Sequence, residues 1–110
     1  GGASVTAADM VRFFEALEDG KLLKPETAAL MTSPVAAMSE SGSQHYGLGV
    51  IISTLGGMTG YGHGGMAPGT QFFSEHYAET GITIIIASNY DTIAGYELNA
   101  AISEIIRGTR

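Results

Sequence analysis

The residue with the clearest chemical potential is a histidine set among glycines, in the segment Gly60-Tyr-Gly-His-Gly-Gly65. Imidazole exchanges protons near neutral pH, so His63 is a candidate acid, base or hydrogen-bond partner. Glycine inside a strand usually marks a place where a ligand or another backbone comes close. The segment therefore predicts an exposed strand edge that lines a site.

Two other interpretations of this segment are weaker. It formally matches the G-x-G-x-x-G dinucleotide fingerprint, but that motif must open a helix, whereas the turn-like Met66-Ala-Pro-Gly69 follows here. A metal site would need His63 and His76 to converge with His45 or Glu75, and these spacings match no compact ligand motif. We therefore expect no nucleotide, no metal and no other cofactor.

A self-contained nucleophilic hydrolase is not indicated either. No stretch reads G-x-S-x-G, and no serine is followed three positions later by a lysine. No serine, threonine or lysine stands in a context that marks an activated nucleophile. The residues alone therefore do not identify a nucleophile in this chain.

The elements that position this edge follow from caps and periodicity. Thr6 predicts a helix N-cap, and Gly20 is typical of a helix C-terminus. A second helix is expected from Pro25 to about Met31. Asp91 or Thr92 can cap a last helix. Apolar residues at helical spacing define the faces that should be buried, namely Met10, Phe13, Phe14 and Leu17 in the first helix and Leu98, Ile102, Ile105 and Ile106 in the last.

Strand-like runs lie between the helices and are joined by short turns, of which Gly56-Gly57 is a two-residue hairpin signal. Short links force neighbouring strands to run antiparallel. The predicted fold class is α+β, with an antiparallel sheet of three to four strands, two N-terminal helices and a C-terminal helix packed on it, in a single domain 1–110. The expected strands are Tyr46–Leu55, Met58–Gly64, Thr70–Tyr77 and Ile82–Ala87.

Composition narrows the possible partners. The chain has 110 residues, of which 45% are hydrophobic and 15% charged, which is a globular balance. Its net charge is −6 and its five Lys and Arg residues are scattered, so a nucleic-acid partner is not expected. No apolar run approaches the length of roughly 20 residues that spans a bilayer. Cysteine is absent, which excludes disulfides and leaves both periplasm and cytoplasm open.

The order of the elements and His63-Gly64-Gly65 together resemble the C-terminal third of the serine β-lactamase and penicillin-binding-protein superfamily, in its class C branch. That branch includes D-alanyl-D-alanine carboxypeptidases, D-aminopeptidases and esterases. The resemblance covers nearly the whole chain and implies a partial β-lactamase or transpeptidase-like fold. The segments that carry it are Gly1–Phe13, Gly20–Thr27, Met31–Pro34, Tyr46–Val50, His63–Gly65 with Pro68-Gly69, and Ile84–Asn89.

The resemblance also implies roles for the residues of the edge. The family's third motif is Lys-Thr-Gly, or His-x-Gly in many relatives, on the strand that borders the catalytic cleft. His63 takes the lysine position and Gly64 the threonine position, while Gly65 is the small residue that lets substrate lie along the strand. The backbone N–H of Met66 would contribute to the oxyanion hole, where preorganised donors stabilise developing charge. His63 and Met66 are thus the implied catalytic groups, and Gly64 and Gly65 the implied substrate-binding positions.

The chain departs from the family pattern in one major respect. Neither the Ser-x-x-Lys motif of the nucleophile nor the second motif, Tyr-x-Asn, occurs in it. Both lie upstream in the family, so we expect this chain to be the C-terminal portion of a serine hydrolase and to be inactive alone. Gly64 also removes a hydroxyl, which favours an esterase or peptidase over a potent β-lactamase.

The expected ligand is a small acyl, peptide or β-lactam substrate. The alternatives are a non-catalytic peptide or cell-wall binding module that uses the same edge by strand addition, and a structural domain without a ligand. The family sheet is covered on both faces, partly by sequence not present here. An uncovered apolar face is therefore also expected, with possible self-association through it.

Overall fold

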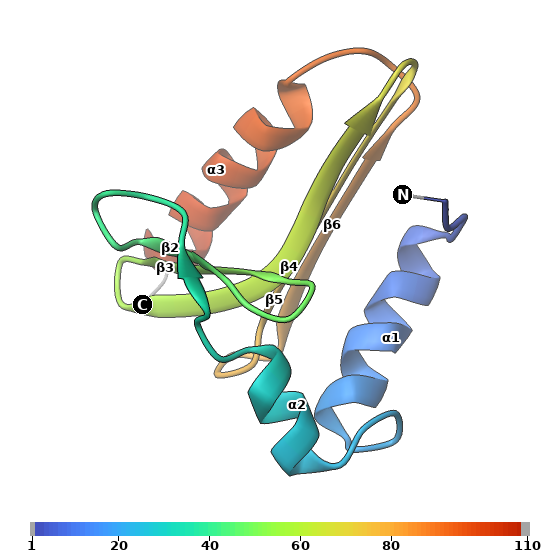
Figure 1. The fold of residues 1–110 in the computed structure, drawn as a ribbon. Coiled ribbons are helices and arrows are strands. Elements are labelled where there is room, and N and C mark those ends of the chain that lie inside the picture. The colour runs from blue at the N-terminus through green and yellow to red at the C-terminus, as the bar shows by residue number, and fades with distance from the viewer. Residues whose placement is uncertain (1, 109–110) are drawn as a thin grey trace.

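A computed structural model describes residues 2–108, and for Leu55 and Arg107 only the backbone. Three helices pack on a six-stranded antiparallel sheet whose strands follow one another in chain order across the described residues. In Figure 1 the sheet lies between α1 and α3, which cover opposite faces. The helices are α1 (Ala7–Glu18), α2 (Pro25–Met31) and α3 (Ala94–Gly108), and the strands are β1 (Ala36–Ala37), β2 (Gln44–Tyr46), β3 (Ile51–Leu55), β4 (Met58–Ala67), β5 (Thr70–Tyr77) and β6 (Ile82–Ser88).

The predicted α+β class is confirmed, but the sheet has six strands where three to four were expected. The expected strand Tyr46–Leu55 is in fact a hairpin, because the chain turns between Tyr46 and Ile51. Gly49 enables this turn with a φ of 81°. A Cβ on Gly47 would collide with the carbonyl oxygen of Met31. Gly47 and Gly49, which the sequence placed inside one strand, therefore form the turn that separates β2 from β3.

The tight turns follow the predicted chemistry. Gly56 and Gly57 both have positive φ, 59° and 79°, as a two-residue hairpin of the primed type requires. Gly69 has a φ of 75° in the turn between β4 and β5. Strand β4 continues to Ala67, past the expected end at Gly64. The edge that carries His63 is therefore longer than the sequence indicated.

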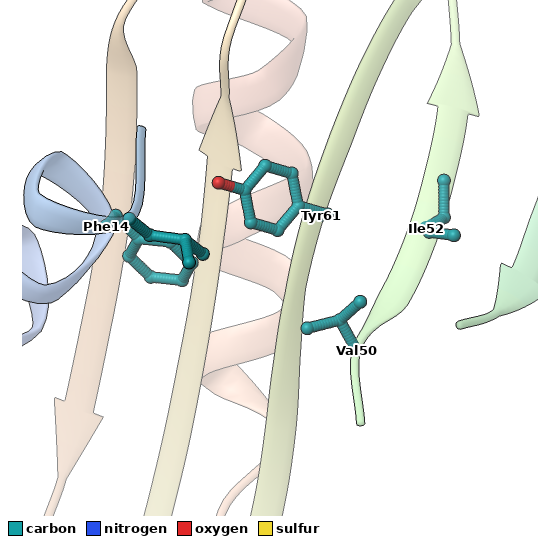
Figure 2. Packing of buried hydrophobic residues seen from close by; sticks show 5 residues of the cluster. Phe14, Val50, Ile52 and Tyr61 are labelled. Carbon is teal, nitrogen blue, oxygen red and sulfur yellow. The ribbon is translucent and has the colours of Figure 1, made fainter. Parts of the chain in front are cut away.

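The first helix begins at the predicted cap, since the Asp9 N–H donates to Thr6 Oγ1 at 3.1 Å. Its inward face anchors one hydrophobic core. Phe14 and Leu17 pack there with Ile52 and Tyr61 of the sheet and with Val50, which directly precedes β3. Figure 2 shows the Tyr61 ring lying between Phe14 and Ile52. Phe13, predicted to share the buried face, is 44% exposed and was wrongly assigned to the core.

The opposite face of the sheet is covered by α3. Ile102 and Ile106 pack on Met58, Tyr77 and Ile84, as the helical spacing predicted.

The prediction that Leu98 and Ile105 also lie on the buried face of α3 was wrong. Leu98 is 50% and Ile105 is 67% exposed. The helix instead turns Gly95, Asn99 and Ser103 inward. These positions follow helical spacing, but small and polar residues occupy them, so a search for apolar periodicity does not find this face.

Several large apolar side chains are exposed, and an uncovered apolar face would require such residues. Those on α3 and in the segment just before it are Tyr90, Ile93, Tyr96, Leu98 and Ile105. Self-association through such a surface stays a prediction. Within residues 2–108, no helix combines the length and apolar character that crossing a membrane demands.

His76, which is buried against the hydrophobic core beneath α1 (the α1 core), should make the free energy of unfolding depend on pH. His76 is 4% exposed, stacks on Phe14 with a ring separation of 5.5 Å, and shares a hydrogen bond of 2.8 Å with Thr83. Burial lowers the pKa of His76 and outweighs the opposing effect of the Glu18 carboxylate, whose oxygen lies 3.8 Å from Nε2. The folded state therefore favours the neutral ring.

Because the unfolded chain binds this proton more readily, the free energy of unfolding should fall as the pH drops below the ordinary histidine pKa of about 6.5. The slope is at most about 1.4 kcal/mol per pH unit from this one group. Urea titrations between pH 7.5 and 5.5 measure it, with His76→Gln as the comparison. An equal slope in His76→Gln would show that another group is responsible.

Candidate active site

Strand β4 has a free edge in its second half. Strand β3 pairs only with Met58–Gly62, whereas β5 pairs with β4 from Tyr61 to Ala67. Among the described residues, the segment His63–Ala67 therefore has a strand partner on one side only. An extended ligand can add to such an edge through backbone hydrogen bonds. We call residues 63–67 of β4 the free edge.

His63 lies at the start of the free edge, and its side chain is exposed. Its Nδ1 is 2.6 Å from the carbonyl oxygen of Gly64, and its Nε2 is 3.1 Å from the hydroxyl of Tyr46 on β2. The Tyr46 and His63 rings meet edge to face, with centroids 5.8 Å apart. Both ring nitrogens thus have a defined partner even though the ring is open to solvent.

Ser74 of β5 fixes which way the backbone of the free edge faces. The His63 N–H donates to Ser74 Oγ at 3.3 Å, and the same hydroxyl donates to the His63 carbonyl at 3.0 Å. Backbone groups alternate between the two sides of a strand. Since the groups of His63 face β5, the N–H of Met66 faces outward, where no strand within residues 2–108 pairs with it. The Met66 side chain is 55% exposed.

The two glycines after His63 face different surroundings. A Cβ on Gly64 would lie 3.0 Å from the hydroxyl of Tyr96 and 3.4 Å from the ring of Phe73, so this position packs toward α3. A Cβ on Gly65 would meet nothing within 4 Å. Only Gly65 therefore leaves open space beside the free edge.

The far end of the free edge is tied to the start of α3. The Gly69 N–H donates to Asp91 Oδ1 at 2.6 Å. The buried Gln71 accepts the Gly95 N–H at 3.0 Å, and a Cβ on Gly95 would come within 2.5 Å of that amide oxygen. Of the two predicted helix caps, Thr92 accepts from Ala94, whereas Asp91 holds the turn between β4 and β5. These contacts fix the hairpin that carries the edge.

The metal interpretation finds no support in residues 2–108, where no group of three or more His, Cys, Asp or Glu side chains could hold an ion. His76 lies in the α1 core, and Glu75 lies on the α3 side, where Tyr77 donates to it at 2.8 Å. His63 and Glu75 border the same cavity of about 470 Å³ beneath α3. His76 and Glu75, however, lie on opposite faces of the sheet, so the predicted ligands do not converge at one point.

Sequence reasoning missed Tyr46 and Ser74 as neighbours of His63. Tyr46 is 17 positions away and Ser74 is 11 positions away along the chain. Only the register of β2, β4 and β5 brings these residues together. The hairpin between β4 and β5 could have suggested Ser74, but no spacing rule indicates Tyr46.

This geometry defines a strand edge that is paired on one side only among the described residues. Comparison with known proteins shows the family. The family model described as Beta-lactamase matches residues 1–105. The chain belongs to this family, within the superfamily of serine β-lactamases and penicillin-binding proteins. Among curated proteins, none matches the chain.

Solved structures show the same fold. A penicillin-binding protein from Bacillus halodurans is 27% identical, with a TM-score of 0.81 over 92% of this chain and 31% of its own. A D-stereospecific amidohydrolase from Streptomyces sp. is 29% identical, with a TM-score of 0.68 over 77% of this chain and 25% of its own. A D-amino acid amidase from Ochrobactrum anthropi SV3 is 23% identical, with a TM-score of 0.77 over 96% and 32%, which supports the fold alone. The chain thus spans a quarter to a third of these proteins.

Proposed function

We propose that this chain is the C-terminal part of a serine hydrolase that cleaves an amide, β-lactam or ester through an acyl-serine intermediate. Its contribution is the free edge of β4. The observation that carries the proposal is the end of β3 pairing at Gly62, directly before the exposed His63. A substrate acyl group can therefore lie along His63–Ala67 without displacing a strand.

In this proposal the backbone N–H of Met66 donates to the oxyanion that forms when a serine attacks the substrate carbonyl. The outward direction of this N–H supports the role, as does the absence of a strand partner for it in the part of the chain that the structure describes. A donor held by a hairpin needs no reorganisation during the reaction, which is why such donors are effective. The serine and its activating lysine come from outside these 110 residues.

His63 stands beside the acyl site as a hydrogen-bonding and proton-exchanging group, and Gly65 leaves room for the substrate backbone. Gly64 supports the site indirectly, since its lack of a Cβ lets Tyr96 approach β4. The proposed substrate class is supported by the similarity to an amidohydrolase and a penicillin-binding protein, which are both more than a quarter identical to this chain.

The isolated chain should therefore show no turnover of nitrocefin or of p-nitrophenyl esters, because it has one wall of the site without a nucleophile. Stopped-flow absorbance on the purified 110-residue chain measures this. Any burst that is abolished by replacing a serine of this chain would contradict the proposed division of the site.

A non-catalytic binding module is the second candidate, because the same free edge can pair with a peptide by strand addition. Titration with an acylated dipeptide, followed at the His63 and Met66 backbone resonances, tests for such binding. The reading frame upstream of the codon for Gly1 separates the two candidates. Ser-x-x-Lys and Tyr-x-Asn motifs there support the hydrolase, and their absence favours the binding module.

A further inference from the structure

Tyr46 is held in place by elements on both sides of it. Its carbonyl accepts the Val35 N–H at 2.8 Å, and its Cα lies opposite Ala36 of β1 and Ile51 of β3. The turn that follows is closed by the Gly47 N–H, which donates to the Val50 carbonyl at 2.8 Å. The Tyr46 ring is therefore presented by a fixed backbone and not by a free loop.

The contacts of the His63 ring determine where its proton lies. A carbonyl oxygen can only accept, so Nδ1, at 2.6 Å from the Gly64 oxygen, must carry a hydrogen. In the neutral ring Nε2 is then the acceptor, and the Tyr46 hydroxyl at 3.1 Å is its donor. The alternative tautomer would set the lone pair of Nδ1 against the carbonyl lone pairs. The Gly64 carbonyl therefore selects the tautomer, and the Tyr46 hydroxyl, which can donate or accept, completes it by donating to Nε2.

We propose that Tyr46 is the positioning residue of His63: its hydroxyl and ring hold the imidazole along the free edge, with Nδ1–H on the Gly64 carbonyl, and without Tyr46 the ring can turn away from that carbonyl and lose its single tautomer. This inference rests on the proposed function for its catalytic meaning, because it states how His63 is presented to a substrate. Tyr46 acts through His63 and is not itself a catalytic residue.

Without Tyr46, the exposed His63 side chain would be free to rotate. A site needs its groups held by neighbours whose own positions are fixed. Gly64 and Gly65 have no side chains that could pack against His63, so the strand itself supplies only the carbonyl of Gly64. Tyr46 supplies the second contact, with a hydrogen bond and an edge-to-face ring contact at 87°. The glycines that open the edge therefore make the tyrosine necessary.

Nitrogen NMR of the histidine ring tests the proposal on the 110-residue chain. The chain is labelled with ¹⁵N-histidine, and long-range proton–nitrogen spectra are recorded at pH 8.5, where imidazole is ordinarily neutral. Wild-type His63 should show a protonated Nδ1 and an unprotonated Nε2. The opposite pattern in the wild-type chain overturns the proposal, whatever any variant does.

Tyr46→Phe isolates the hydroxyl because it keeps the aromatic ring. We expect both ring nitrogens of His63 to move toward the averaged shifts of a mixed tautomer, and the Nδ1–H signal to be lost to exchange with water. Tyr90→Phe is the matched control, since Tyr90 is 72% exposed. Unchanged His63 nitrogen shifts in Tyr46→Phe would contradict the positioning role. These spectra do not depend on turnover, so failure here is distinct from failure of the proposed hydrolase.

Discussion

Replacing Gly62 by alanine should lower the free energy of unfolding by about 3 kcal/mol or more. A Cβ at this position would collide with the Ser74 carbonyl oxygen, and it would lie 2.7 Å from the Ser74 carbonyl carbon and 2.9 Å from the Glu75 Cα. All of these atoms belong to the backbone of β5, so no side chain can rotate away. Overpacking in a fixed environment usually costs about 1–3 kcal/mol, and a clash with backbone should lie at the upper end or beyond it.

Gly65→Ala is the matched control for this loss. It makes the same chemical change only three positions further along β4, where a Cβ meets nothing within 4 Å. Its free energy of unfolding should change by no more than about 1 kcal/mol in either direction. Urea titrations of both variants make the comparison. Equal midpoints for Gly62→Ala and Gly65→Ala would mean that β4 and β5 do not approach as closely as described.

Most of the fold could be predicted from local signals. Thr6 caps α1 and Pro25 begins α2 where the sequence indicated, and Gly56-Gly57 forms the expected hairpin. These signals depend on a few neighbouring residues, whose backbone preferences do not need the rest of the chain. Local chemistry therefore located most of the elements correctly.

The errors arose where distant contacts override local patterns. Gly47 separates β2 from β3 because Met31 of α2 leaves no room for a side chain there. The buried face of α3 carries Asn99 and Ser103 because Glu75 and Tyr77 of the sheet offer polar partners. Neither neighbour lies close in sequence, so neither effect could be read from spacing.

The candidate site, like the fold, was predicted from the sequence only in part. The glycines around His63 predicted an exposed edge, and the pairing of β3 and β4 leaves residues 63–67 free as expected. The roles given to His63, Gly64, Gly65 and Met66 came from the family resemblance and remain proposals. The contact with Tyr46 depends on sheet register alone, and no sequence signal indicates it.

A large loss of kcat should follow when the backbone N–H of Met66 is removed. Met66→Pro eliminates the N–H that we propose for the oxyanion hole, and proline is tolerated at an unpaired strand edge. Loss of one oxyanion-hole donor typically lowers kcat by about 10²–10³-fold. Met66→Leu keeps the N–H and changes only an exposed side chain. In the parent hydrolase that the proposed function requires, the proline variant should therefore lose far more activity than the leucine variant.

The kcat of these two variants for nitrocefin and a p-nitrophenyl ester tests the central claim, that the free edge of β4 is one wall of an acyl-serine site. The account predicts that Met66→Pro turns over at least about a hundredfold more slowly than Met66→Leu while both remain folded. Equal rates for the two variants, or a parent protein with no serine-dependent turnover, would contradict it.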